Sequence, residues 1–154
     1  MSSQELKQKG FTIIEVVLVL AIAALIFLMV FIALPALQRN QRDTQRRSDA
    51  GSFVSQISQY STNNKGAIPD SAADVTSFVT NYMKGGAGGS FNDPKSGNPY
   101  TVTYSIGAPT AEGVIYYHNS ATCDGETIIN GTNPRIGAVA MKLEGAGVFC
   151  QETK

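Results

Sequence analysis

The chain has 154 residues, with 12 Lys and Arg against 12 Asp and Glu, so its formal net charge is zero. This length leaves room for one domain and little more. A neutral chain has no overall field to attract nucleic acid or an acidic substrate, which excludes a strongly basic nucleic-acid-binding protein. The hydrophobic share of 43% is ordinary, but the apolar residues are distributed unevenly along the chain.

The first long element is an apolar run from Phe11 to Leu34, in which only Thr12 and Glu15 are polar. As a helix this run is about 36 Å long, and the hydrocarbon core of a bilayer is about 30 Å thick. It therefore predicts a membrane-spanning helix, and the residues before it, 1–10, form a short polar leader. Because the run exceeds the apolar region of a signal peptide and has its small residues inside it, we expect it to stay in the mature protein.

A second helical pattern follows directly, over 35–61. Its apolar positions recur at i, i+3, i+4, i+7 and i+10 from Ala50, after the charged stretch QRNQRDTQRRSD. We therefore expect one long helix over about 11–60, amphipathic in its second half. Pro35 lies inside it, lacks a backbone donor and predicts a kink.

Residues 62–154 predict a small head. The segment PDSAADVTSFVTNYMKGG starts with Asp and Ser, keeps its apolar residues on one face and reaches Gly85, so it predicts a short second helix. The glycine-rich GGAGGS lacks the Lys of a phosphate-binding loop and is expected to be a connector. Four short strands are then expected, at 100–106, 113–118, 136–143 and 147–150. The predicted fold class is α+β, with the long helix packed on one side of a small antiparallel sheet.

The residues KGFTIIEVVLVLAIAAL, from Lys9 to Leu25, resemble the N-terminus of type IV pilins and pseudopilins. The resemblance implies that a prepilin peptidase cuts between Gly10 and Phe11 and that the new terminus at Phe11 is N-methylated. It implies that Glu15 is the carboxylate used in filament assembly. It also implies the pilin-like "ladle", in which the long helix carries the head.

The chemistry of an acid in an apolar helix explains why Glu15 needs a partner. A lone charge at mid-bilayer costs about 2.5–3.5 kcal/mol on insertion scales. Cleavage would place an amine on Phe11, four residues before Glu15. In a filament, Glu15 of an incoming subunit would meet the Phe11 amine of a neighbour and set the stagger between them. The alternative is an acid without a partner that reaches for water at the membrane boundary.

A cluster of four arginines follows the apolar run: Arg39, Arg42, Arg46 and Arg47. Compared with the two lysines of the leader, they would place the head in the cytoplasm by the positive-inside rule. The pilin resemblance places it outside, and we follow the resemblance. Asp43 has helical spacing to several of them, so we expect a solvated, salt-bridged helix face. Contacts with neighbouring subunits or with lipid phosphates are the alternatives, and nucleic-acid binding has only these arginines in its favour.

Cys123 and Cys150 are the only cysteines. Outside the cytoplasm they should form a disulfide, which would stabilise the chain by roughly 3–4 kcal/mol in the chain-entropy model. It would tie down the polar segment DGETIINGTNPR and resembles the cysteine-bounded loop near the C-terminus of many pilins. In a cytoplasmic domain the two thiols would stay unlinked.

Other chemistry is weakly indicated. His118 is the only histidine, lies at the end of an expected strand and has no assignable catalytic partners, so we expect no enzyme activity and no cofactor. Asn130-Gly131-Thr132 matches a glycosylation sequon, but we interpret Asn-Gly as a tight turn. Some pseudopilins bind Ca²⁺ near their C-terminal loops, yet the scattered acids here are expected to be solvated and no metal site is predicted. Those acids are Asp93, Asp124 and Glu126.

Three functions fit these observations. The first is a subunit of a type IV pilus that serves motility or adhesion. Such a subunit is made in the inner membrane and processed by the prepilin peptidase and N-methyltransferase. An assembly platform then adds it to an extracellular helical filament of its own copies and minor pilins. The second is a pseudopilin of a type II secretion or DNA-uptake (competence) filament. The cysteine pair favours a pilin, whereas DPKSGNPY is similar to pseudopilin segments. The third, a single-pass membrane-anchored ligand-binding protein, requires the N-terminal motif to be a coincidence.

Overall fold

The computed structural model describes residues 10–83, 91–145 and 147–153, so the predicted leader before Gly10 and the segment GGAGGS lie outside the described residues. The chain forms two compact units, one ending at Gln38 and one starting at Arg39. The helices and strands are α1 (Ile13–Asn63), α2 (Ala72–Tyr82), β1 (Thr101–Tyr104), β2 (Val114–Asn119), β3 (Ala121–Asp124), β4 (Thr127–Asn130), β5 (Gly137–Lys142) and β6 (Val148–Glu152).

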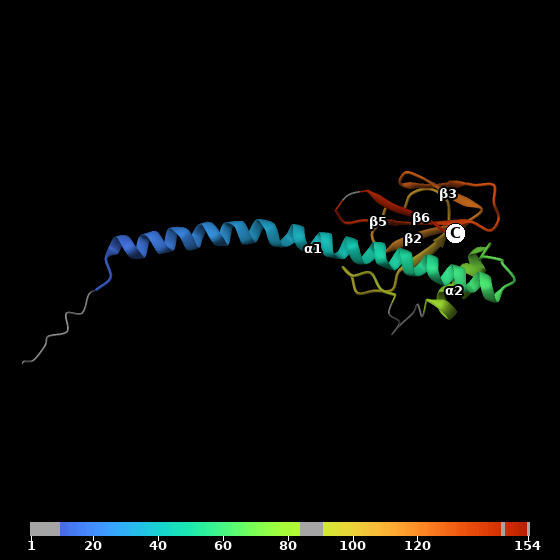
Figure 1. Cartoon of the computed structure of the whole chain (residues 1–154), viewed down its shortest axis with the longest axis horizontal. Coiled ribbons are helices and arrows are strands. Elements are labelled where there is room, and N and C mark those ends of the chain that lie inside the picture. The colour runs from blue at the N-terminus through green and yellow to red at the C-terminus, as the bar shows by residue number, and fades with distance from the viewer. Residues whose placement is uncertain (1–9, 84–90, 146, 154) are drawn as a thin grey trace, which may run out of the picture. The chain divides into compact units, whose positions relative to one another are not determined.

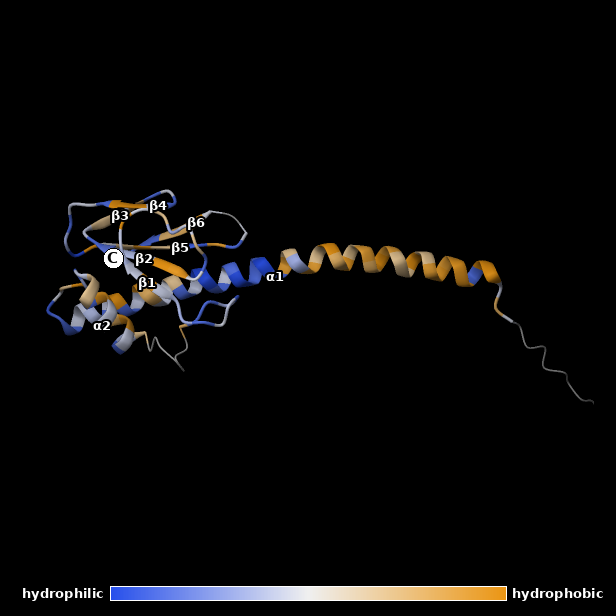
Figure 2. Cartoon of the chain, turned by 180° about the vertical axis from the view of Figure 1, so that it is seen from behind, coloured by the Kyte–Doolittle hydropathy of each residue, from blue (hydrophilic) through white to orange (hydrophobic). Residues whose placement is uncertain are grey.

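The helix α1 confirms the predicted long helix. It starts after Thr12, continues through Pro35 and ends at Asn63, where Lys65 and Gly66 take positive φ angles of 56° and 87°. Its apolar first half is coloured orange in Figure 2 and is long and apolar enough to cross a membrane. The kink that Pro35 suggests stays a prediction.

The second half of α1 and the short helix α2 bury the apolar faces that their sequences predict. On α1 the buried apolar residues are Ala50, Phe53 and Ile57. Ser71 caps the start of α2, whose Val75 and Phe78 are buried. The Phe53 ring lies 5.1 Å from the Phe78 ring in an edge-on arrangement, so the two helices share one aromatic core with the sheet.

The main sheet has four strands in the order β1-β2-β5-β6, at the four predicted places. The prediction of a wholly antiparallel sheet is wrong, because β1 and β2 pair in parallel, with Thr101 opposite Val114. The connection between these strands does not turn back as a hairpin. It runs past β4, where Gly107 and Ile128 exchange two backbone hydrogen bonds of 2.8 and 3.0 Å, so the chain re-enters the sheet in its original direction.

A second sheet, the hairpin of β3 and β4, was not predicted. Its two-residue turn contains Gly125, whose φ of +59° suits the first position of a type II′ turn. The tight turn expected at Asn130-Gly131 is wrong, because Asn130 is paired with Ala121 inside the ladder and the hairpin turns at Gly125 instead.

The central strand β5 is covered on both faces. Val139 and Met141 belong to the core beneath α1, whereas Ala138 and Ala140 pack against the β3–β4 hairpin. In Figure 1 the hairpin lies on the side of β5 and β6 away from α1. The small alanines allow this second layer to approach closely, which the prediction of a single covered face did not include.

Candidate functional site

The start of α1 is held by a capping box. The Thr12 amide donates to Glu15 Oε2 at 2.9 Å, and the Thr12 hydroxyl donates to the same oxygen at 2.8 Å. In return the Glu15 amide donates to Thr12 Oγ1 at 3.3 Å. This is the reciprocal arrangement of a T-x-x-E cap, in which two otherwise unpaired amides at the helix start find partners. The spacing of Thr12 and Glu15 is itself a local signal for this cap.

The capping box changes how the acid is understood. Glu15 is not an acid without a partner, because its carboxylate closes the first turn of its own helix, where the helix dipole also favours negative charge. Among the described residues, the capping bonds to its side chain end on Oε2. A shallow apolar notch surrounds the carboxylate, and Phe11, Val16, Val19 and Leu20 line it.

The bond between Gly10 and Phe11 lies just before the first helical residue. Phe11 is 90% exposed, and Gly10 is exposed as well. A side chain added at Gly10 would meet nothing within 4 Å, so the folded chain itself does not require glycine there.

The prediction of a solvated, salt-bridged helix face is confirmed only in part: Arg39 and Arg47 are exposed, and Arg46 pairs with Asp43. It is wrong for the solvation of Arg46. Arg46 is completely buried, with Nε 2.8 Å from Asp93 Oδ1. Its other nitrogens lie 3.3 Å from Asp43 Oδ1 and 3.3 Å from Glu112 Oε2. Burial alone would lower the pKa of Arg46, but the nearby carboxylates raise it by more, so the net shift is upward and the guanidinium stays cationic.

Arg42 also has a defined partner rather than a solvated side chain. Its Nε and Nη2 each lie 2.7 Å from an oxygen of Glu144, a bidentate pair that lowers the pKa of that carboxyl. Asp43, the next residue of α1, accepts the amides of Glu144 and Gly145, each at 2.7 Å. Arg39 remains 59% exposed and lies 3.9 Å from Glu144.

Asp93 was expected to be a solvated acid, and this is also wrong. It is 2% exposed and accepts from Arg46 and from the amide of Ser96 at 3.0 Å. Burial raises the pKa of Asp93, but these hydrogen bonds outweigh it and the net shift is downward. Asp124 and Glu126 lie on either side of the Gly125 turn and are exposed. Within residues 10–83, 91–145 and 147–153, no group of three His, Cys, Asp or Glu is placed to hold a metal ion.

The cysteines form a disulfide, which removes the alternative of unlinked thiols. The bond joins Cys123 of β3 to Cys150 of β6, with the Cα atoms 5.9 Å apart. The Cys123 amide also donates to Glu152 Oε1 at 2.8 Å. Together these links fasten the hairpin to the edge strand of the main sheet.

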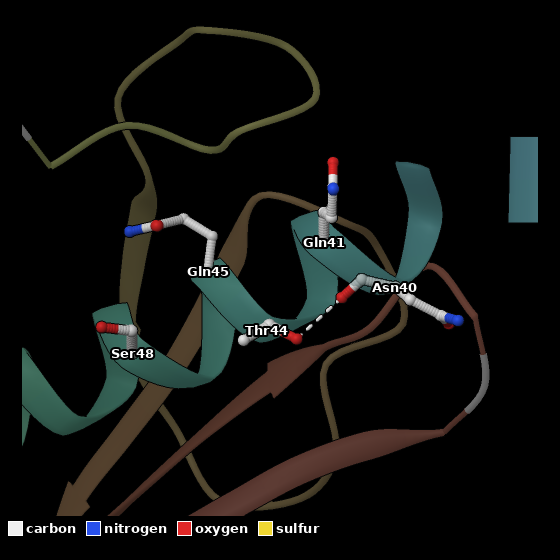
Figure 3. A pocket seen from close by; sticks show the side chains of 5 residues that line it. All are labelled: Asn40, Gln41, Thr44, Gln45 and Ser48. Carbon is white, nitrogen blue, oxygen red and sulfur yellow. Dashed lines mark hydrogen bonds between the residues drawn. The ribbon is translucent and has the colours of Figure 1, made fainter. Parts of the chain in front are cut away.

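In the part of the chain that the structure describes, two other polar features are the surroundings of His118 and a groove along α1. His118 lies in β2 and stacks on the Tyr104 ring at 4.4 Å, while Tyr104 donates to Asn119. A shallow groove along α1 is lined by uncharged polar side chains, and Thr44 donates to the Asn40 carbonyl at 2.8 Å (Figure 3). The residues that line it are Asn40, Gln41, Thr44, Gln45 and Ser48.

The fold and the N-terminal site define a class, a pilin-like α+β protein. Its long helix is apolar in its first half and is capped by Thr12 and Glu15. A family model, the prokaryotic N-terminal methylation motif, matches residues 6–31. This motif is the prepilin signature of type IV pilins and pseudopilins, and the chain carries it. The apolar helix and the motif fit membrane anchoring. No curated protein and no solved structure matches the chain.

Proposed function

We propose that the chain is a structural subunit of a type IV pilus. A prepilin peptidase cuts between Gly10 and Phe11, the new terminus is methylated, and an assembly platform draws the subunit from the inner membrane into a helical filament outside the cell. The helices α1 of neighbouring copies pack together there, and Glu15 of one copy pairs with the Phe11 amine of the next. The methylation motif over residues 6–31 carries this proposal.

The geometry at Glu15 supports this assembly role. The capping box holds the carboxylate at the very start of the apolar helix, inside a notch lined by apolar side chains. A neighbour's amine that enters this notch would neutralise the acid in a water-poor environment, where leaving either charge alone is costly. Thr12 and the amine can share the carboxylate because a carboxylate has two oxygens and several lone pairs.

Two substitutions separate the charge of Glu15 from its capping role. In Glu15→Gln the side chain can still close the capping box, since Gln serves at this position, but it cannot form an ion pair. In Thr12→Val the carboxylate remains and the cap is lost. We expect Glu15→Gln to insert into the membrane and to be processed normally, yet to be missing from filaments. Val17→Ala, close to Glu15 but outside the lining of the notch, is the matched control and should assemble.

The direct test is mass spectrometry of fibres sheared from cells that make the natural protein. We expect a mature subunit that begins with N-methylated Phe11 and dominates the sheared material. Fibres whose subunit retains the leader would overturn the proposal. A normal fibre yield from Glu15→Gln would show that assembly does not need the ion pair. Only the packing of the α1 helices would then remain of the proposed mechanism.

A pseudopilin of a secretion or DNA-uptake filament is the second candidate. The segment DPKSGNPY, 93–100, is similar to pseudopilin segments. Abundance discriminates the two functions, because a major pilin is plentiful in sheared surface material. A processed and methylated chain that is scarce in that material would favour the pseudopilin.

A further inference from the structure

The head meets α1 through two kinds of contact that follow one another along the helix. The buried residues of α1 are, in order, Asp43, Arg46, Ala50, Phe53 and Ile57. The first two are charged and the last three are apolar. The contact between α1 and the head is therefore ionic at one end and apolar at the other.

The ionic end reaches segments that are far apart in the sequence. Arg46 binds Asp93, 47 residues away, and Glu112, 66 residues away. Arg42 binds Glu144, 102 residues away. Each of these three acids lies in a connection outside the regular helices and strands. One face of α1 thus gathers three separate loops.

Hydrogen bonds within the loops complete the arrangement. Asp93 also accepts from the amides of Lys95 and Ser96, and Lys95 Nζ lies 2.9 Å from Glu112. Gly145 fits closely, because an added Cβ would lie 2.9 Å from Asp43 Oδ2. The loop 92–98 is bounded by Phe91 and Tyr100, which are buried in the core with Phe53 of α1. Between these two apolar anchors the loop is held by its polar partners.

We propose that this ionic clamp, formed by Arg42, Asp43 and Arg46 with Asp93, Glu112 and Glu144, is a separate fastening of the head to α1 that can open while the apolar core stays closed. A buried ion pair adds little net stability compared with apolar residues of the same volume, but removing one partner leaves uncompensated buried charge. The clamp therefore fixes the positions of the three loops more than it stabilises the head. Regions held in this way can open locally, at a free-energy cost smaller than that of global unfolding.

Hydrogen–deuterium exchange of the full chain in detergent micelles tests the proposal. In Arg46→Met we expect the amides of the loop 92–98 and of Glu144 and Gly145 to exchange at least about tenfold faster, while the amides of β2 and β5 keep their rates. Ser48→Met, which places the same side chain at an exposed position of α1, is the matched control and should leave both regions unchanged.

Two milder variants keep the test valid if Arg46→Met does not fold. Arg46→Lys retains the charge but loses the planar fork, and Asp93→Asn retains the shape of the partner. Both should accelerate exchange in the same loops and spare β2 and β5. Equal acceleration in the loops and the two strands would show a single cooperative unit, and unchanged loops would show that the clamp holds nothing. Either result would overturn the proposal.

Discussion

The two halves of α1 place the same kinds of side chain in opposite environments. Phe31, in the apolar half, is 73% exposed in the isolated chain, whereas Phe53, in the second half, is completely buried. Among the charged residues, Glu15 bonds to Thr12 three positions away, while Arg46 binds acids from distant loops. One continuous helix thus has a half that its own chain covers and a half that it leaves uncovered.

This difference shows which surroundings each half of α1 needs. A helix that is apolar all round must be buried by lipid or by other chains, whereas an amphipathic helix buries one face against its own domain. The second half of α1 meets its requirement within the head through Ala50, Phe53 and Ile57. The first half meets it only in a membrane or in an assembly.

The largest expected effect compares one substitution in each half. Phe53→Ala should lower the free energy of unfolding of the head by about 3–5 kcal/mol, because it leaves a cavity among Phe78, Phe91 and Tyr117. Phe31→Ala should leave that free energy unchanged. Chemical denaturation of both variants in micelles, followed by the near-ultraviolet dichroism of the tyrosines, measures this. Equal losses would show that the first half also packs on the head.

The sequence predicts the elements whose signals are local. The periodicity of α1, the Ser71 start of α2, the four strands of the main sheet and the prepilin motif all follow from neighbouring residues. The hairpin of β3 and β4 also had a local signal, since Gly125-Glu126 between two short strand-forming stretches has the glycine that a type II′ turn requires at its first position. The T-x-x-E cap at Glu15 was equally readable.

The features that were missed depend on distant partners. Nothing near Arg46 indicates that Asp93 and Glu112 will surround it, so the helix spacing to Asp43 suggested a solvated face instead. The parallel pairing of β1 depends on the bridge from Gly107 to β4, which lies later in the chain. The second cover on β5 depends on the hairpin and its disulfide in the same way.

The disulfide gives the second largest expected effect and sharpens the comparison, because it lies only in the head. Cys123→Ala with Cys150→Ala should cost roughly 3–4 kcal/mol of unfolding free energy in the chain-entropy model. The hairpin has little apolar packing to hold it, since its buried cluster contains Ala121, Ile128 and two alanines of β5. Denaturation with and without reductant measures the loss, and membrane insertion should not change. An unchanged unfolding midpoint under reduction would contradict this expectation.

Acid should weaken the charged part of the second half of α1, where it meets the head. The pKa values of Asp93 and Glu144 lie below their ordinary values, so the stability they contribute is present at neutral pH and is lost as pH falls through the lowered values. The free energy of unfolding should therefore decline as the pH falls below about 5 and through the lowered pKa values.

The matched pair of variants for this experiment is Arg42→Met and Arg39→Met. Arg42 forms the bidentate pair with Glu144, so its loss should flatten the decline, whereas the exposed Arg39 at 3.9 Å should change it much less. Urea denaturation at several pH values measures the slopes. Identical slopes of unfolding free energy against pH in both variants would mean that the ion pair with Arg42 does not lower the pKa of Glu144.

The smallest expected effect compares the caps of the two helices. The amide of Asp74 donates to Ser71 Oγ at 3.2 Å, and Ser71 Oγ donates to Asp74 Oδ2 at 2.6 Å, much as Thr12 and Glu15 close the start of α1. Ser71→Ala should therefore cost about 1 kcal/mol of unfolding free energy, because the loss leaves an amide of the first turn to water. Ser77→Ala, on the exposed side of α2, is the control and should be neutral or slightly stabilising, since Ala is the better helix former. Water can replace the hydrogen bond that Ser71→Ala removes, but no water is available to replace the bond that Thr12→Val removes if the start of α1 lies in a bilayer. The Thr12→Val substitution should therefore destabilise its helix start more than Ser71→Ala does. Equal fraying of both helices in amide exchange would show that the start of α1 lies in water rather than in lipid.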